Sequence, residues 1–281
     1  MISFAATALP QVIPQSSDYV RILPELVLAI FGMAVMALDP LLGDRATQKT
    51  LGAVGLLGTL AALGATAYMA QAPGLAFWDM IRVDTFSVFF HFVVITVAAI
   101  TILTSHEYMA VQQLRAGEYY ALILFGTLGM ALMSSAVELV LIFIALEISS
   151  IATYILAGFR RRFAISGESS LKYFLLGSFA TAFFLYGVAL MFGATGSTNI
   201  QVIAQALGNG PIPVLAYAAA ALMFVGVGFK VAAAPFHVWT PTSTRAHRHP
   251  LSGSCRPAPK PRHLRCCCGL CLKRVCPALF G

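Results

Sequence analysis

Two ionisable residues lie deep inside apolar runs of the sequence, where they could hold a proton or pass one on. Glu147 lies within LIFIALEISSIATYIL (141–156), and Lys230 follows the sixteen uncharged residues 214–229. An ionised side chain at the centre of a bilayer costs roughly 2.5–3.5 kcal/mol on insertion scales. Burial disfavours the charged form of each residue, whereas a nearby opposite charge favours it, and this balance suits a proton-transfer pair. The alternative for Glu147 is a structural ion pair.

Lys172 and His237 are two further candidates for a proton path. Lys172 lies in ESSLKYFLLGSF (168–179), where it can instead pair with Glu168, four residues earlier, or extend to the membrane surface. His237 lies seven residues after Lys230, so the two share nearly the same face if the helix continues. An imidazole exchanges protons near neutral pH. The alternative for His237 is a histidine hydrogen-bonded at the membrane interface.

The sequence after Lys230 predicts an interrupted helix. Pro235 cannot donate a hydrogen bond to the carbonyl of Val231, and its ring crowds that carbonyl. We therefore expect the helix to kink or open there. Non-helical backbone at membrane depth is tolerated where it lines a water-filled cavity. A lysine beside such a break is placed where protons can reach it.

The elements that must position these residues are transmembrane helices. The chain of 281 residues is 59% hydrophobic and only 10% charged, whereas soluble proteins carry about 25% charged residues. A span requires about 20 mainly apolar residues. Seven segments qualify: 22–42, 50–71, 84–104, 118–136, 137–158, 169–193 and 212–234. We expect an all-α, polytopic bundle of six or seven spans, because the fourth and fifth segments either meet in a tight turn at Ser134-Ser135 or form one broken segment.

Charged and small residues refine this arrangement. Six Lys or Arg lie in the odd-numbered loops, against two in the N-terminal segment and the even-numbered loops. Cytoplasmic loops carry the excess of Lys and Arg, so we expect the N-terminus outside. Glu25 and Asp39, near the two ends of the first span, are predicted to be interface residues rather than proton relays. Gly177, Gly187 and Gly193 are predicted to serve close helix packing.

Residues 242–281 differ from the rest of the chain. They contain eight Lys or Arg, no acidic residue and all six cysteines, whereas residues 1–241 carry ten basic and eleven acidic residues. The basic balance comes from the tail alone, so we expect no nucleic-acid partner. A zinc site in the tail is disfavoured because paired CxxC modules are lacking. We predict an incomplete transmembrane domain at 1–241 and a disordered, basic, Cys-rich tail at 242–281.

Three runs resemble subunit N of the proton-translocating NADH-quinone oxidoreductase, bacterial complex I. They are ALEISSIATYILAGFRR (145–161), GESSLKYFLLGSFATAFFLYGVALMFGATGSTNI (167–200) and GFKVAAAPFHVWTP (228–241). The resemblance implies an antiporter-like fold, in which Glu147 matches the glutamate of the fifth helix and Lys230 the lysine of the broken seventh helix. Lys172 matches the lysine that begins KYFLLG. His237 matches the histidine after the break.

The resemblance implies a membrane-arm subunit with one proton half-channel, in which Glu147 and Lys230 form the coupled pair. The half-channel would couple NADH oxidation and quinone reduction to proton translocation. We expect no cofactor or metal on this chain, because residues 1–241 lack nucleotide-binding and haem motifs; NADH and quinone would be used by the whole complex. The implied partners are the other membrane-arm subunits and the lipid bilayer. The implied location is the bacterial inner membrane, with the N-terminus in the periplasm.

Three alternatives to this function remain open. The first is a subunit of a multisubunit cation/proton antiporter, which shares the architecture. The second is a non-functional truncated fragment that is degraded after synthesis. The third is a metal-binding membrane scaffold that uses the cysteine tail.

The resemblance to the family's amino-acid sequence stops after Pro241. Relatives continue past Trp-Thr-Pro with Asp-Val-Tyr-Glu-Gly-Ala-Pro-Thr-Pro, whereas this chain continues with TSTRAHRHP. Adding one guanine nucleotide before the codon of Thr242 shifts the reading frame, and the shifted frame can encode the family's sequence. In the same frame, the nucleotides that encode residues 257–275 can encode the family's next helix. We therefore hypothesise a single-base deletion here, by mutation or in sequencing. The nucleotide sequence across this position tests the idea, and an intact frame would refute it.

Overall fold

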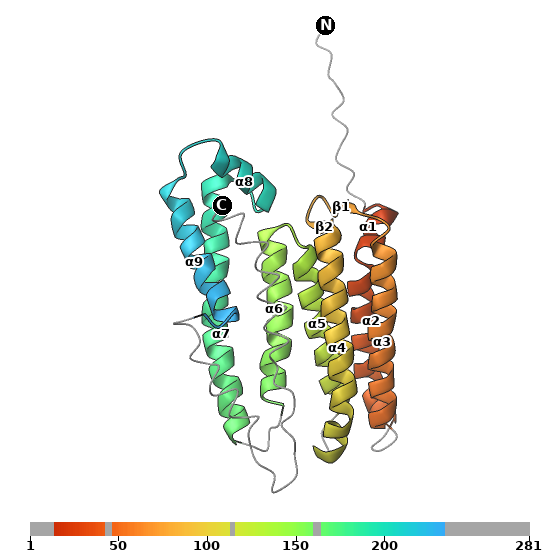
Figure 1. The fold of residues 1–281 in the computed structure, drawn as a ribbon. Coiled ribbons are helices and arrows are strands. Elements are labelled where there is room, and N and C mark those ends of the chain that lie inside the picture. Colours follow the sequence, from red (N-terminus) through yellow and green to blue (C-terminus); the bar gives the residue numbers. More distant parts are fainter. Residues whose placement is uncertain (1–13, 43–46, 113–115, 160–163, 234–281) are drawn as a thin grey trace.

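The computed structural model describes residues 14–42, 47–112, 116–159 and 164–233, which form a bundle of helices (Figure 1). Seven long helices in these residues are α2 (Leu23–Leu42), α3 (Thr47–Met69), α4 (Thr85–Gln112), α5 (Ala116–Ser135), α6 (Leu139–Ala157), α7 (Ala164–Thr195) and α9 (Val214–Lys230). Each predicted span coincides with one of them, so the all-α prediction is confirmed. By length and composition α2, α3, α4, α6 and α7 can cross a membrane, and α9 is a shorter apolar helix of 17 residues.

Four short elements lie together at one end of the bundle (Figure 1). They are α1 (Ser16–Arg21), the antiparallel hairpin of β1 (Gly74–Ala76) and β2 (Ile81–Val83), and α8 (Ile200–Gly208). Arg21 ties α1 to the hairpin, because its Nη1 donates to the carbonyl of Leu75 at 2.6 Å. Asn199 caps α8, since its side chain accepts from the N–H of Gln201.

The three-residue connection between α5 and α6, residues 136–138, is held on both sides by backbone hydrogen bonds. The N–H of Val137 donates to the carbonyl of Met80 in the hairpin, at 2.8 Å. The carbonyl of Val137 accepts from the N–H of Ile200 at the start of α8, at 3.0 Å. The predicted fourth and fifth spans are therefore separate helices joined by a tight turn, and this turn fixes where α6 begins.

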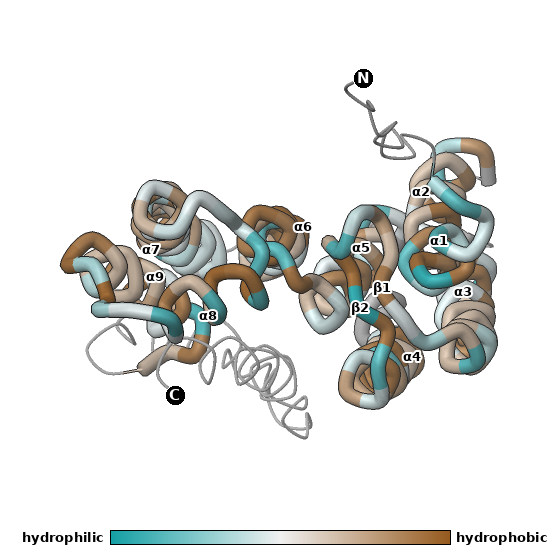
Figure 2. Tube along the Cα trace, turned by 90° about the horizontal axis from the view of Figure 1, so that it is seen from above, coloured by the Kyte–Doolittle hydropathy of each residue, from teal (hydrophilic) through white to brown (hydrophobic). Residues whose placement is uncertain are grey.

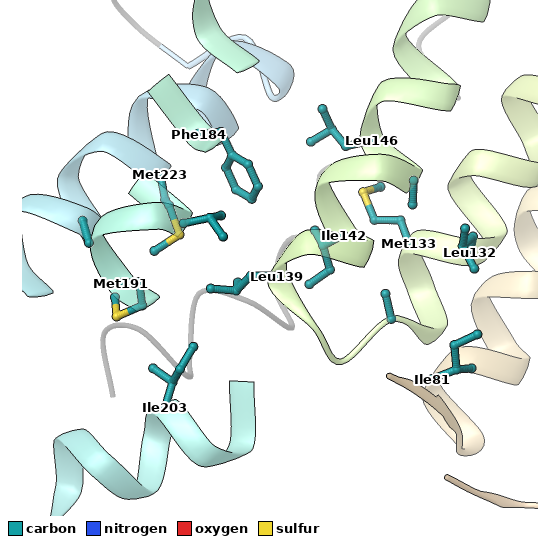
Figure 3. Packing of buried hydrophobic residues seen from close by; sticks show 14 of the residues in the cluster. Ile81, Leu132, Met133, Leu139, Ile142, Leu146, Phe184, Met191, Ile203 and Met223 are labelled. Carbon is teal, nitrogen blue, oxygen red and sulfur yellow. The ribbon is translucent and has the colours of Figure 1, made fainter. Parts of the chain in front are cut away.

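The long helices form two groups, with α6 between them. Seen from above, α2 to α5 lie on one side, and α7 and α9 lie beyond α6 on the other (Figure 2). The core of the first group includes Leu28, Leu51, Ile95, Tyr120 and Leu124. The core of the second joins α6, α7 and α9 through residues that include Leu139, Ile142, Phe184, Met191 and Met223 (Figure 3). Large apolar side chains also cover the outside, such as Phe179 and Val214. Helices apolar on all sides suit a lipid environment.

Glycines bring α7 and α9 into close contact. A Cβ added at Gly187 would lie 2.8 Å from the carbonyl oxygen of Ala219, and one at Gly226 would lie 2.8 Å from that of Ala180. Neither position has room for a side chain without moving backbone. The packing role predicted for Gly187 is confirmed, and Gly226 is a position that the sequence argument missed.

The other two predicted packing glycines differ from each other. Gly177 lies against the hydroxyl and ring of Tyr154 on α6, so its packing role is confirmed. A Cβ at Gly193 would meet only Leu215, at the ordinary contact distance of 3.6 Å. The prediction for Gly193 is wrong, because a side chain at this position would have room against α9.

Helix α9 ends at Lys230 in a left-handed turn. Ala232 has a φ of 53°, and the N–H of Ala233 donates to the carbonyl of Gly228 at 2.9 Å. This six-to-one hydrogen bond over a left-handed residue is the Schellman arrangement, which usually has glycine where Ala232 lies. Helix α9 thus ends at the lysine itself, ahead of Pro235, while the break predicted at Pro235 lies outside the described residues.

Candidate proton-transfer site

Glu147, Ser150 and Tyr154 lie along one face of α6, because residues three, four and seven apart in a helix are neighbours. This face is turned toward α7 and α9. The ring of Tyr154 meets that of Tyr173 on α7 edge to face, with centroids 4.6 Å apart, and Lys230 of α9 contacts Ser150. Three helices thus enclose the predicted acid and base.

Glu147 is half-buried, and its Oε1 is fully enclosed. Among the residues that the structure describes, this oxygen has no hydrogen-bond partner. A buried polar atom without a partner is costly, and an ionised carboxylate more so. Burial thus leaves this oxygen of Glu147 without compensation from the described residues.

Lys230 reaches across from the last residue of α9 to α6. Its Nζ donates to Oγ of Ser150 and lies 5.1 Å from the centroid of the Tyr154 ring. The Ser150 hydroxyl donates in turn to the carbonyl of Leu146, so its oxygen is left to accept from the lysine. An aromatic face attracts a cation. Neutral groups of α6 therefore hold the lysine in this arrangement.

The structure brings Glu147 and Lys230 to the same helix face without joining them in the contacts described. Lys230 is held at Ser150, which lies three residues after Glu147, or about 4.5 Å along the helix axis. A lysine side chain can cover that distance by changing rotamers. Two forms can be defined for this arrangement: a separated form, with Lys230 held at Ser150 as in this structure, and a paired form, in which the lysine contacts the carboxylate.

Lys172 is placed elsewhere. Its Nζ lies 2.5 Å from Oε1 of Glu168, and the side chains are 51% and 58% exposed. The local pair along the helix, one of the alternatives from the sequence, is therefore the one that the structure shows. The next residue, Tyr173, faces inward against Phe229. The structure does not bring Lys172 to Glu147 or Lys230.

His237 lies outside the described residues, as do Pro235 and the tail at 242–281. The role of His237 and the boundary at 241–242 stay predictions.

The prediction that Glu25 is an interface residue is wrong. Only 3% of it is exposed, and its Oε1 lies 2.9 Å from Nε2 of His91, which is fully buried. The position of Glu25 near the end of the first span suggested an interface residue, and His91 was not among the predicted site residues. The signal available was a histidine in the otherwise apolar run TFSVFFHFVVIT (85–96).

The fold and the site define a class: a helical membrane protein of the antiporter-like kind, with a half-buried acid and base on facing helices. In agreement, the family model described as "NADH:quinone oxidoreductase/Mrp antiporter, TM" matches residues 136–255. The matched region contains Glu147, Lys172 and Lys230.

Similar proteins narrow this class. The chain is 58% identical to "NADH-quinone oxidoreductase subunit N 2" of Koribacter versatilis (strain Ellin345), over 86% of this chain and 51% of that protein. It is 44% identical to "NADH-quinone oxidoreductase subunit N 1" of Solibacter usitatus (strain Ellin6076), over 86% of this chain and 50% of that protein. This chain is therefore similar to NADH-quinone oxidoreductase subunit N over most of its own length. It spans about half the length of the curated relatives it matches.

Two solved structures share the fold. One chain of respiratory complex I from Thermus thermophilus with bound aureothin superposes with a TM-score of 0.63 at 35% identity, covering 78% of this chain and 46% of that chain. One chain of the membrane-bound sulfane sulfur reductase, an archaeal respiratory membrane complex, gives a TM-score of 0.69 at 25% identity, covering 81% and 48%. The antiporter-like fold is therefore found in more than one respiratory complex.

Proposed function

We propose that this chain contributes one proton half-channel to the membrane arm of an NADH-quinone oxidoreductase. The observation that carries the proposal is the arrangement on α6. A buried carboxyl oxygen of Glu147 lacks a partner among the described residues, and one helical turn away Lys230 is held by Ser150 and Tyr154. An acid and a base at this separation can trade charge, whereas a fixed ion pair cannot.

The proposed cycle alternates between the separated and the paired form. In the paired form each charge stabilises the other, so the lysine holds its proton and Glu147 is a carboxylate. In the separated form burial favours the neutral states, so the ammonium of Lys230 gives up a proton and the carboxylate of Glu147 takes one up. Quinone reduction elsewhere would perturb charges along the membrane arm and drive the exchange, and the released proton would move toward the other half-channel.

Further parts of the proposal rest on the family resemblance. Lys172 and His237 are proposed as additional residues of the proton path, with Lys172 first releasing Glu168. The chain would bind no cofactor itself, since NADH and quinone would be used by the whole complex. Its partners would be the other membrane-arm subunits and the lipid bilayer. Its location would be the bacterial inner membrane, with the N-terminus in the periplasm, as the distribution of Lys and Arg indicates.

The test is a lysine substitution in a full-length relative assembled in its complex. Alanine at the position aligned with Lys230 removes the base, so we expect the protons pumped per NADH oxidised to fall severalfold while the complex still assembles. Alanine at the position aligned with Lys49, an exposed lysine in the first turn of α3, is the matched control and should leave pumping unchanged. Unchanged pumping in the Lys230 variant, with normal assembly, would contradict the proposal.

A second candidate function, a subunit of a multisubunit cation/proton antiporter, is supported by the family description, which names the Mrp antiporter. The flanking genes discriminate, because a complex I operon would carry the other membrane-arm subunits. Cation-driven proton movement in vesicles that lack NADH would favour the antiporter. A truncated product that is degraded would instead be recognised by the near-absence of the protein in cells that transcribe the gene.

A further inference from the structure

A second buried acid and base lie in the first helix group, remote from Lys230 in the fold. Glu25 lies in the first turn of α2 and His91 in the second turn of α4. Their side chains are 4% and 0% exposed, and Nε2 of His91 lies 2.9 Å from Oε1 of Glu25. Ser134, in the last turn of α5, places its Oγ 3.1 Å from Nδ1 of the same ring. Three helices thus meet at this cluster, near the end of the bundle that carries α1 and the hairpin (Figure 1).

The partners of His91 fix where its protons lie. Nδ1 is 2.7 Å from the carbonyl oxygen of Ser87, which can only accept, so Nδ1 is assigned a proton. The hydroxyl of Ser134 donates to the carbonyl of Ala131, which leaves its oxygen able to accept from Nδ1 as well. A single proton then lies between Nε2 and Oε1. It makes the pair either imidazolium with carboxylate or neutral imidazole with carboxylic acid, and both forms have zero net charge.

The second oxygen of Glu25 is the open position of the cluster. Oε2 is buried and, among the described residues, has no hydrogen-bond partner. A carboxylate oxygen in this state is costly to keep charged and dry. A water molecule can satisfy it. A second proton would instead neutralise the carboxylate, which gives imidazolium with carboxylic acid and a net charge of +1. Proton uptake at Oε2 forms one O–H bond and breaks none within the pair.

Few charges act on this cluster from the helices around it. The charged residues of α3 and α5, Lys49 and Glu118, lie in first turns at the opposite end of the bundle. On the near side, Arg21 donates to carbonyls of the turn at 72–75, and Asp84 accepts from the backbone N–H of Ser87. Asp18 lies 3.5 Å from Arg21. Arg82 lies in β2, two residues before Asp84.

We propose that Glu25 and His91 form a second proton-binding site, which titrates as one unit and takes up its additional proton at Oε2 of Glu25. The site lies near the end of the bundle from which α2 and α4 start, so water beyond the hairpin is the source of the proton. The site is independent of the exchange proposed for Glu147 and Lys230, because neither of those residues belongs to it.

The test is pH-difference infrared spectroscopy of the full chain in lipid nanodiscs. We expect a carboxyl C=O band to appear as the pH falls, and the band of the hydrogen-bonded imidazole to shift at the same pH because its partner loses its charge. Both should be lost in Glu25→Gln and retained in Glu147→Gln, which is the matched control. Persistence of the carboxyl band in Glu25→Gln, or carboxyl and imidazole changes at separate pH values, would overturn the proposal.

Circular dichroism would reveal a variant that fails to fold. A second measurement, on the wild-type chain, tests the proposal in that case. The ¹⁵N spectrum of histidine-labelled wild-type chain should contain one histidine with Nδ1 protonated at every pH and only Nε2 responding to pH. A spectrum in which all histidines lose the Nδ1 proton would refute the assignment. Loss of pumping by Lys230 variants would leave these signals unchanged, so the two proposals fail separately.

Discussion

Each of the two helix groups contains an acid and a base, but the first pair is buried, the second is half-buried, and the two pairs are held differently. In the first group Glu25 and His91 are in contact at 2.9 Å, and we call them the closed pair. In the second group Glu147 and Lys230 share a helix face without a described contact, and we call them the open pair. The closed pair lies between regular helices. The open pair includes the residue at which α9 ends.

Under the two proposals, this difference would let the closed pair store a proton and the open pair move one. The closed pair has one low-energy arrangement of its side chains. It can therefore gain or lose a proton while Glu25 and His91 stay in contact. An open pair has two arrangements, because the lysine can bind either the neutral groups of α6 or the carboxylate. Because α9 ends at Lys230, no further turn of the helix packs beside this side chain. This favours an exchange of partners by the lysine.

The largest expected effect breaks the closed pair. His91→Leu leaves Glu25 buried with neither oxygen bonded, so we expect the free energy of unfolding in mixed micelles to fall by about 3 kcal/mol. Replacing both residues by leucine should recover most of this loss, because no buried polar atom then lacks a partner. A single variant as stable as the wild type would show that the pair contributes nothing.

The next effect concerns the group that holds the open pair apart. Ser150→Ala removes the oxygen that accepts from Lys230, and we expect a loss of about 1–2 kcal/mol in the same unfolding measurement. The lysine should then move toward Glu147, which a shift of the Glu147 carboxyl band in the infrared would report. Thr153→Ala on the same helix is the control, and it should not shift that band. An unmoved band in Ser150→Ala would argue against the two-form account.

A smaller effect tests the turn at the end of α9. Ala232 occupies a left-handed conformation that glycine adopts without a steric penalty, so Ala232→Gly should stabilise the fold by up to about 1 kcal/mol. Ala220→Gly, within α9, should destabilise it by a similar amount. Destabilisation by both substitutions would show that the turn at Ala232 does not form.

The smallest effect is expected at Glu147 itself. Glu147→Gln removes no described hydrogen bond of Oε1, so we expect unfolding free energies within about 0.5 kcal/mol of the wild type. Glu25→Gln is the matched change in the closed pair and should cost about 1 kcal/mol or more. Equal losses in the two variants would remove the contrast between the groups.

Much of this fold could be predicted from the sequence, because a span in lipid has to be long, apolar and helical. The seven segments, the turn after Ser135 and the interruption after Lys230 all followed from apolar length and from Pro235. The hairpin at 74–83 and α8 did not, because their strands and turns are too short for a periodic signal. Their positions depend on tertiary hydrogen bonds such as that between Val137 and Met80.

The site was predicted in part for a similar reason. Glu147 and Lys230 stood out because charges within long apolar runs are rare. Ser150 and Tyr154 did not, since nothing in the sequence shows which polar residue of α6 a lysine from α9 will reach. The closed pair was missed because Glu25 and His91 lie 66 residues apart and are brought together only by the packing of α2 and α4 against α5. His237 and the change of frame after Pro241 stay predictions.

The central claim is that Glu147 and Lys230 act as one unit, and a double-mutant cycle on pumping tests it most directly. Protons pumped per NADH oxidised would be measured in a complete, assembled complex with Glu147→Gln, Lys230→Met and both together, at the aligned positions. If the two residues exchange a proton, the double variant should pump about as well as the weaker single variant. If the fractional losses of the two single variants multiply in the double variant, the residues act independently and the account is contradicted.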